Sequence, residues 1–172
     1  MKINLMLSVL LLTLSASVLA QNTTNKASLR IGEITIPTTG ANSRLELSPQ
    51  SLGYLRADFS ITPLDLSPSD AKVFAVEDGA GGSVYLALDN DAPIQFSVFM
   101  SGQINKQIAL QKNIAYDFTL FVGPTSATLW QRTKTAIIKI GTLSHSLVPP
   151  FKIAVGTQRT GARFSDIIVK EQ

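Results

Sequence analysis

The feature that most constrains the fold of this chain is a strict two-residue alternation of apolar and polar side chains. It is clearest over residues 54–62, where every second side chain is apolar: Leu55, Ala57, Phe59 and Ile61. Successive side chains of a β-strand point to opposite faces of a sheet, so this pattern predicts a strand with one buried and one solvated face. No segment after residue 20 sustains the three- and four-residue spacing of an amphipathic helix. The chain is therefore expected to be all-β.

Similar short segments recur along the chain, separated by the turn-forming residues glycine, proline, asparagine and aspartate. We expect further strands over 29–36, 44–47, 71–77, 83–89, 94–100, 104–110, 115–122, 127–132, 135–140, 151–155 and 164–170. In the first of these, apolar residues change parity at Gly32, which indicates a bulge or a break. The segment 89–93 is expected to be a turn. About ten to twelve short strands with turns between them predict a two-sheet sandwich or a barrel.

The first twenty residues differ in character from the rest. Lys2 precedes an apolar run over 5–14, and small residues then lead to Ala20. This order is that of a secretory signal peptide, and the run is shorter than the roughly 20 residues a membrane span needs. We expect a signal peptide over 1–20, a flexible polar tail over 21–28 and a single β-sandwich domain over 29–172. The protein is then exported to a periplasm or the extracellular space, without a transmembrane segment.

Composition narrows the classes of function. The 172-residue chain has no cysteine and one histidine, which excludes a disulfide-stapled module and a cysteine-based zinc site. The net charge of +3 is too small to predict a nucleic-acid partner. Charged residues make up only 16% of the chain, so few side chains are available for acid–base chemistry. This scarcity favours binding or a structural role over catalysis.

The last third of the chain carries a family resemblance. A strand over 116–118 and one ending near Trp130 are followed by 151–156 and by a final strand with the sequence Phe-Ser-Asp-Ile-Ile-Val over 164–169. This order resembles the closing half of concanavalin A-like (laminin-G-like) lectin and glucanase domains, which often end in Phe-Asp-Asn-Ile-x-Val. Ser165 and Asp166 depart from that pattern. The segment 54–61 resembles an early, long strand of the same fold.

The resemblance implies a two-sheet antiparallel jelly roll, often with a saccharide or protein ligand and sometimes with calcium. Another β-sandwich, immunoglobulin-like or fimbrial, is the alternative that the residues leave open.

The best candidate binding residue is Trp130. Thr128, Trp130 and Arg132 share the polar parity of their strand, so Trp130 is expected on the outer face, where it can stack on a sugar or anchor a protein. A slip of one residue would instead bury it. Tyr54 and Arg56, on the solvent side of the clearest strand, form a second possible platform. The predicted ligand-binding residues are Trp130, Tyr54, Arg56 and Arg132, with a glycan or a cell-surface protein as partner.

Asp89 and Asp91 offer oxygen ligands of the kind calcium prefers, and Glu77 or Asp78 of the neighbouring loop is available to complete such a site. They are the predicted metal ligands, although Asp and Asn side chains in such a segment far more often only form a turn by bonding to their own backbone. Calcium is the one cofactor that these residues suggest.

No catalytic residue is predicted. The one histidine, His145, lies in a Ser-His-Ser segment without a nucleophile elbow. The Glu-x-Asp-x-Glu string of glucan hydrolases with the resembling fold is absent from the sequence. Three functions follow in order of preference. They are an exported binding module, a structural or envelope-assembly subunit without a small ligand, and a glycoside hydrolase.

Overall fold

The structure is a computed structural model that describes residues 28–38, 42–47, 52–66, 70–92, 95–100 and 108–172. Side chains are not described for residues 28, 70–71, 89–92 and 95–100. The predicted signal peptide and all but the last residue of the predicted tail lie outside this part of the chain.

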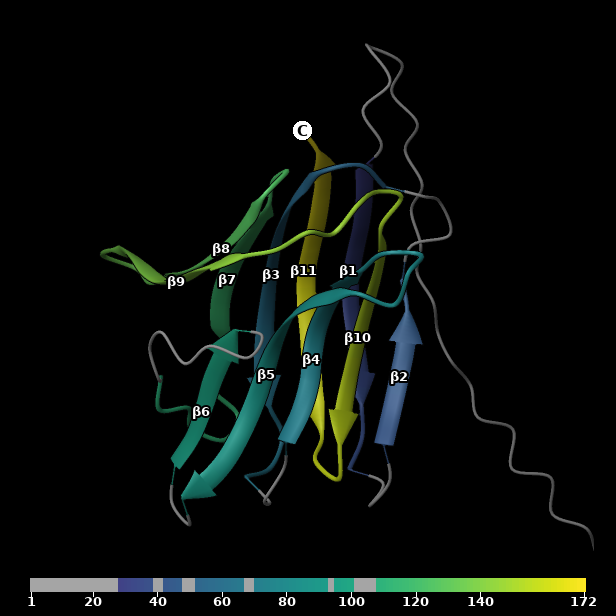
Figure 1. Cartoon of the computed structure of the whole chain (residues 1–172). Helices are drawn as coiled ribbons and strands as arrows, with labels where there is room; N and C mark the ends of the chain where they lie inside the picture. The colour runs from purple at the N-terminus through teal and green to yellow at the C-terminus, as the bar shows by residue number, and fades with distance from the viewer. Residues whose placement is uncertain (1–27, 39–41, 48–51, 67–69, 93–94, 101–107) are drawn as a thin grey trace, which may run out of the picture.

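Within the described residues, eleven strands form two antiparallel sheets, which confirms the expected all-β sandwich (Figure 1). The six-stranded sheet has the order β1 (Ser28–Ile36), β11 (Ala162–Glu171), β3 (Leu55–Pro63), β7 (Tyr116–Val122), β8 (Ser126–Arg132) and β9 (Ile137–Ser144). The five-stranded sheet has the order β2 (Asn42–Glu46), β10 (Lys152–Gln158), β4 (Asp70–Glu77), β5 (Ser83–Ala92) and β6 (Gln95–Met100). No helix among the described residues is long and apolar enough to cross a membrane.

The core lies between the two sheets and is filled by alternate residues of their strands. The four apolar side chains that the alternation in β3 predicts to be inward are all fully buried: Leu55, Ala57, Phe59 and Ile61. Phe59 stacks on Phe74 of β4, with ring centroids 4.0 Å apart and planes 1° from parallel. Because β3 and β4 belong to different sheets, this aromatic pair joins the two layers.

The parity change at Gly32 is confirmed, and a bulge in the neighbouring strand accompanies it. The apolar side chains of β1 that pack against the core are Leu29, Ile31, Ile34 and Ile36. Gly32 lies opposite Asp166 of β11, which has a φ of 52°. The register of β11 against β3 shifts between Ser165 and Ile168, so β11 contains one extra residue there. Beyond this bulge Ile168 lies opposite Asp58.

Several strands are longer than the sequence predicts, among them β5, β9, β10 and β11. β5 continues to Ala92 through the segment expected to be a turn, with a register shift against β6 between Asp89 and Ala92. β9 covers 137–144 rather than 135–140. Pairing with a neighbouring strand satisfies the backbone of both segments, which overrides their local turn preference. Most of the strand expected over 104–110 lies outside the described residues.

Candidate ligand-binding site

The outer face of the six-stranded sheet, which points away from the other sheet, gathers aromatic and charged side chains. In an antiparallel ladder, residues directly opposite each other project from the same side. Trp130 of β8 lies between Thr119 of β7 and Lys139 of β9. One row further along, Arg56 of β3 lies opposite Phe121 of β7. Residues from four strands thus meet on one surface.

These side chains border a depression of about 320 Å³, which we call the Trp130 depression. The residues that line it are Arg56, Thr119, Phe121, Trp130, Arg132, Ile137 and Gln172. Trp130 and Phe121 are half-buried, and Ile137 is 73% exposed. Apolar surface therefore forms much of the wall, and two guanidinium groups stand beside it.

Three of the four predicted ligand-binding residues, Trp130, Arg56 and Arg132, come together in this depression. Trp130 is on the outer face beside Arg132, as the parity of its strand predicts, and is not part of the buried core.

Tyr54 does not line the Trp130 depression. Its ring packs edge-on against Phe151, with centroids 5.8 Å apart and planes at 65°, at the border of the core. Its carbonyl oxygen accepts a hydrogen bond of 2.8 Å from the amide of Gln172, which does line the depression. Tyr54 is therefore connected to the Trp130 depression only through its backbone contact with Gln172, and its role as a binding residue stays a prediction.

Asp58 organises the polar side of the Trp130 depression. Its two carboxylate oxygens accept hydrogen bonds of 3.1 Å from Nε and Nη2 of Arg56, and Oδ1 also accepts one of 2.5 Å from the Thr119 hydroxyl. Burial raises the pKa of Asp58, but the hydrogen bonds from Thr119 and Arg56 and the charges of Arg56 and Arg132 outweigh it and hold the pKa below its ordinary value of 3.8. Asp58 is thus a fixed anion at neutral pH.

Arg132 is less completely paired than Arg56. Its Nη1 lies 3.7 Å from Oδ1 of Asp58, which is an ion-pair distance but too long for a hydrogen bond. Its Nε is buried and has no hydrogen-bond partner among the described residues. A buried donor without an acceptor costs about 1–3 kcal/mol, so the Arg132 side chain is not fully satisfied by contacts within the protein.

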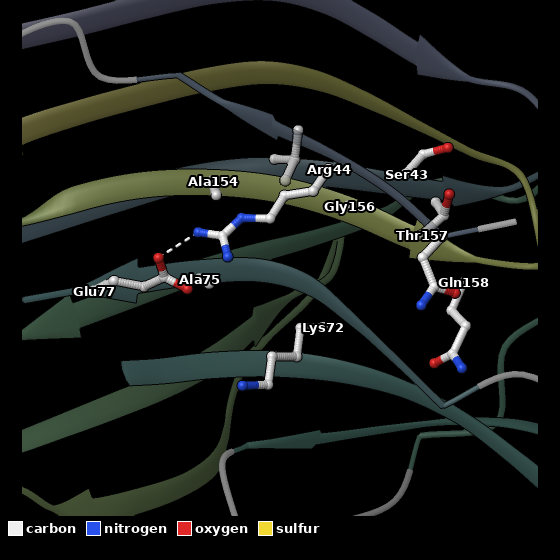
Figure 2. A pocket seen from close by; sticks show the side chains of 11 residues that line it. Ser43, Arg44, Lys72, Ala75, Glu77, Ala154, Gly156, Thr157 and Gln158 are labelled. Carbon is white, nitrogen blue, oxygen red and sulfur yellow. Dashed lines mark hydrogen bonds and ion pairs between the residues drawn. The ribbon is translucent and has the colours of Figure 1, made fainter. Parts of the chain in front are cut away.

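A second depression, of about 260 Å³, lies on the outer face of the five-stranded sheet (Figure 2). The small residues in its lining are Ala75, Ala154 and Gly156. Arg44 of β2 and Glu77 of β4 form an ion pair across β10. The Lys72 ammonium lies 4.4 Å from the ring centre of Tyr85. These charged groups interact within the protein, whereas the buried hydroxyl of Thr157 in the same lining has no hydrogen-bond partner among the described residues.

The predicted calcium ligands receive no test from this structure. Asp89 and Asp91 lie in β5, and their side chains fall outside the description. Among the described residues, no three histidine or carboxylate side chains lie close enough to hold a metal ion. Glu77 is paired with Arg44, and Oδ1 of Asp78 accepts the amides of its own turn at 3.0 and 2.7 Å. The calcium site stays a prediction.

His145 holds its own loop together. Its Nδ1 accepts a hydrogen bond of 3.1 Å from the amide of Leu147, and its backbone amide donates one of 3.0 Å to the carbonyl oxygen of Thr125. Only the first of these contacts involves the imidazole, whose Nε2 is buried without a hydrogen-bond partner among the described residues.

Sequence reasoning did not single out Asp58, Thr119 or Phe121. Phe121 carries the same signal as Trp130, because it stands on the polar parity of β7, opposite to Phe118 and Leu120. Asp58 shares the solvent parity of Arg56, two residues away on β3. Asp58 and Phe121 are therefore both recognisable in the sequence, as a charged and an aromatic residue at strand positions that alternate with the buried ones.

No protein-family model and no curated protein sequence matches this chain. Solved structures do match. A ligand-free Crh5 transglycosylase superposes with a TM-score of 0.58 at 13% identity, over 92% of this chain and 81% of its own. The carbohydrate-binding module CBM66 from Bacillus subtilis superposes with a TM-score of 0.51 at 12% identity, over 84% of this chain and 95% of its own. A heptameric SAP-like pentraxin from Limulus polyphemus superposes with a TM-score of 0.53 at 11% identity, over 79% of this chain and 74% of its own.

These neighbours are concanavalin A-like jelly rolls, and the chain has that fold, as its sequence resemblance predicts. At identities this low, the likeness defines the fold and leaves the function to the site.

Proposed function

We propose that this protein is a binding module that holds a carbohydrate in the Trp130 depression. The observation that carries the proposal is the meeting of Trp130 with Arg56, Asp58 and Arg132 on one sheet face. A sugar ring has an apolar face of C–H groups and an edge of hydroxyls. An indole ring suits the face, and charged groups held in fixed positions suit the edge.

The fold likeness supports this proposal without fixing it. One structural neighbour is a carbohydrate-binding module and another is a transglycosylase, so the same architecture is used both to bind and to convert sugars.

Electrostatics at the site favour binding over hydrolysis. Glycosidases use two carboxyl groups, one of them an acid with a raised pKa. None of the residues lining the Trp130 depression is acidic, and the pKa of the adjacent Asp58 is lowered, not raised. Asp58 is also bound to Arg56 and Thr119, which suits a structural anion better than a proton donor.

The module is expected to act outside the cytoplasm, in keeping with the predicted signal peptide.

The test is binding of the purified chain to a glycan array, followed by calorimetry with the strongest ligand. Trp130→Ala is expected to weaken binding about tenfold or more, the effect of removing an aromatic anchor worth over 1.4 kcal/mol. Tyr85→Ala is the matched control, because Tyr85 is a half-buried aromatic residue on the outer face of the other sheet. It should bind like the wild type.

Two results would overturn the proposal. If the wild type bound no glycan and eluted as a stable multimer, a structural subunit would be the better description. If Trp130→Ala bound normally and Tyr85→Ala did not, the site would lie on the five-stranded sheet.

A further inference from the structure

We infer that the carbohydrate is acidic, a glycan carrying carboxylate or sulfate groups, and that Arg132 recognises the anion. This inference rests on the proposed function, since it concerns the ligand of the same site. It comes from the charge of the surface around the Trp130 depression and from the unsatisfied hydrogen-bonding groups of Arg132.

The surface around the depression has more positive than negative groups. The cations whose pairing places them on this face are Arg30, Arg56, Arg132, Lys139, Arg163 and Lys170, and the acids are Glu33, Asp58 and Asp117. Six cations therefore face three acids. Glu33 pairs with Arg163, which leaves Asp58 and Asp117 as the acids beside Arg132. Lys139 is directly opposite Trp130, so one of the uncompensated charges stands beside the proposed stacking surface.

Neither acid satisfies Arg132. Asp58 accepts two hydrogen bonds from Arg56 and a third from Thr119. The distance between its Oδ1 and Nη1 of Arg132 is 3.7 Å. Asp117, opposite Arg132 in the ladder, accepts a hydrogen bond from the Ser60 hydroxyl. The side chain of Arg132 is 36% exposed and lines the depression, although its Nε is buried, so a ligand can reach part of the side chain.

The geometry of a guanidinium selects for an oxyanion. Its two terminal Nη groups form a planar fork that matches the two oxygens of a carboxylate or sulfate, whereas a sugar hydroxyl cannot pair with both prongs in this way. Trp130 and Arg132 are two residues apart on one strand face, about 7 Å along β8. A ring stacked on Trp130 would therefore carry its charged substituent toward Arg132.

The experiment uses a glycan array in which each neutral oligosaccharide is printed beside an acidic form of the same oligosaccharide. In one arm the acidic form carries uronate carboxylates, and in the other arm it carries sulfate esters. The wild type is expected to bind the acidic member of at least one pair at least tenfold more tightly at physiological salt. Arg132→Gln should abolish this preference, and Arg132→Lys, which keeps the charge but loses the fork, should restore only part of it. Arg44→Gln on the opposite sheet is the matched control and should behave like the wild type.

The outcomes separate this inference from the proposed function. Equal binding of neutral and acidic members, still lost in Trp130→Ala, overturns the inference and leaves carbohydrate binding standing. An acid preference that survives in Arg132→Gln also overturns it. Equal, Arg132-dependent binding of poly-glutamate would show that the anion alone is recognised, not an acidic sugar. No binding to any member of the array overturns both.

Discussion

Arg56 and Asp58 form a two-pronged ion pair along a single strand, with Nε and Nη2 of the arginine each 3.1 Å from a different carboxylate oxygen. Residues two apart on a strand share a face, so the pair forms without bending β3. Thr119 on the neighbouring strand β7 donates to the same carboxylate. Contacts within the protein therefore hold the polar side of the Trp130 depression in place, which would lower the entropic cost of the proposed binding.

The first prediction concerns Asp58→Asn, which keeps the shape of the side chain and removes its charge. We expect the free energy of unfolding to fall by about 1–2 kcal/mol at neutral pH, because hydrogen bonds to charged groups are stronger than neutral ones and this pair is only partly screened by solvent. Urea denaturation followed by circular dichroism measures the change. Asp166→Asn is the control, since Asp166 is exposed and its positive φ suits asparagine equally well.

This difference should depend on pH in a definite direction. The folded-state pKa of Asp58 is below its ordinary value of 3.8, so its contribution is fully present above that value and is lost as the pH falls through the folded pKa. The wild type and Asp58→Asn should therefore differ by a constant amount from about pH 7 to 5 and converge below about pH 4. A gap that widened in acid would contradict the role given to Asp58.

The second prediction concerns the contact between the sheets. Phe74→Ala removes one ring of the Phe59–Phe74 stack from a fully buried position and should cost about 3–5 kcal/mol of unfolding free energy. Val148→Ala, at a side chain 66% exposed, should change it by less than about 0.5 kcal/mol. Comparable losses in both variants would mean that the stack does not hold the layers together.

The third prediction concerns Gly156 of β10, which lies between β2 and β4 in the five-stranded sheet. A Cβ atom there would lie 2.8 Å from the carbonyl oxygen of Ser43 and 3.2 Å from that of Lys72, both backbone atoms of neighbouring strands. Gly156→Ala should therefore destabilise the fold by about 1–3 kcal/mol, the usual cost of overpacking. Gly32→Ala meets nothing within 4 Å and should be neutral or about 0.5–1 kcal/mol stabilising. Thermal unfolding of the two variants, measured in parallel with the wild type, gives the change in stability that each substitution causes.

The local sequence pattern was sufficient to predict the fold class and three of the residues that line the Trp130 depression. Alternation in β3 identified all four of its inward residues, and polar parity placed Trp130 on the outer face beside Arg132. Both inferences need only the orientation of side chains along one strand, which a period of two determines.

Features that depend on pairing between distant segments were beyond the sequence. Which residue lies beside Arg56 depends on the registers of β11 and β7 against β3, and the bulge near Asp166 alters one of them. Tyr54 was expected on the solvent face, but it precedes β3, and its ring contacts Phe151, nearly a hundred residues later. Nothing in the sequence near Tyr54 signals that partner.

The fourth prediction concerns export. If residues 1–20 act as a signal peptide, the protein recovered outside the cytoplasm of an expressing bacterium should begin at Gln21, which mass spectrometry of the intact chain measures. Leu10→Arg places a charge in the apolar run and should keep the chain inside the cell at its full length. Recovery of the wild type with Met1 intact in the cytoplasm would contradict the prediction.

The last prediction uses the fact that Trp130 is the only tryptophan of the chain, so the intrinsic fluorescence reports on the proposed site alone. Trp130 is half-buried, and its emission should be quenched by acrylamide in the free protein. A glycan stacked on the indole displaces water from it, so binding should shift the emission to shorter wavelength and reduce the quenching. Arg132→Gln should require more of an acidic glycan for the same shift, because the indole is unchanged and only the anion contact is lost. A glycan that binds by calorimetry but alters neither emission nor quenching would place the ligand away from Trp130.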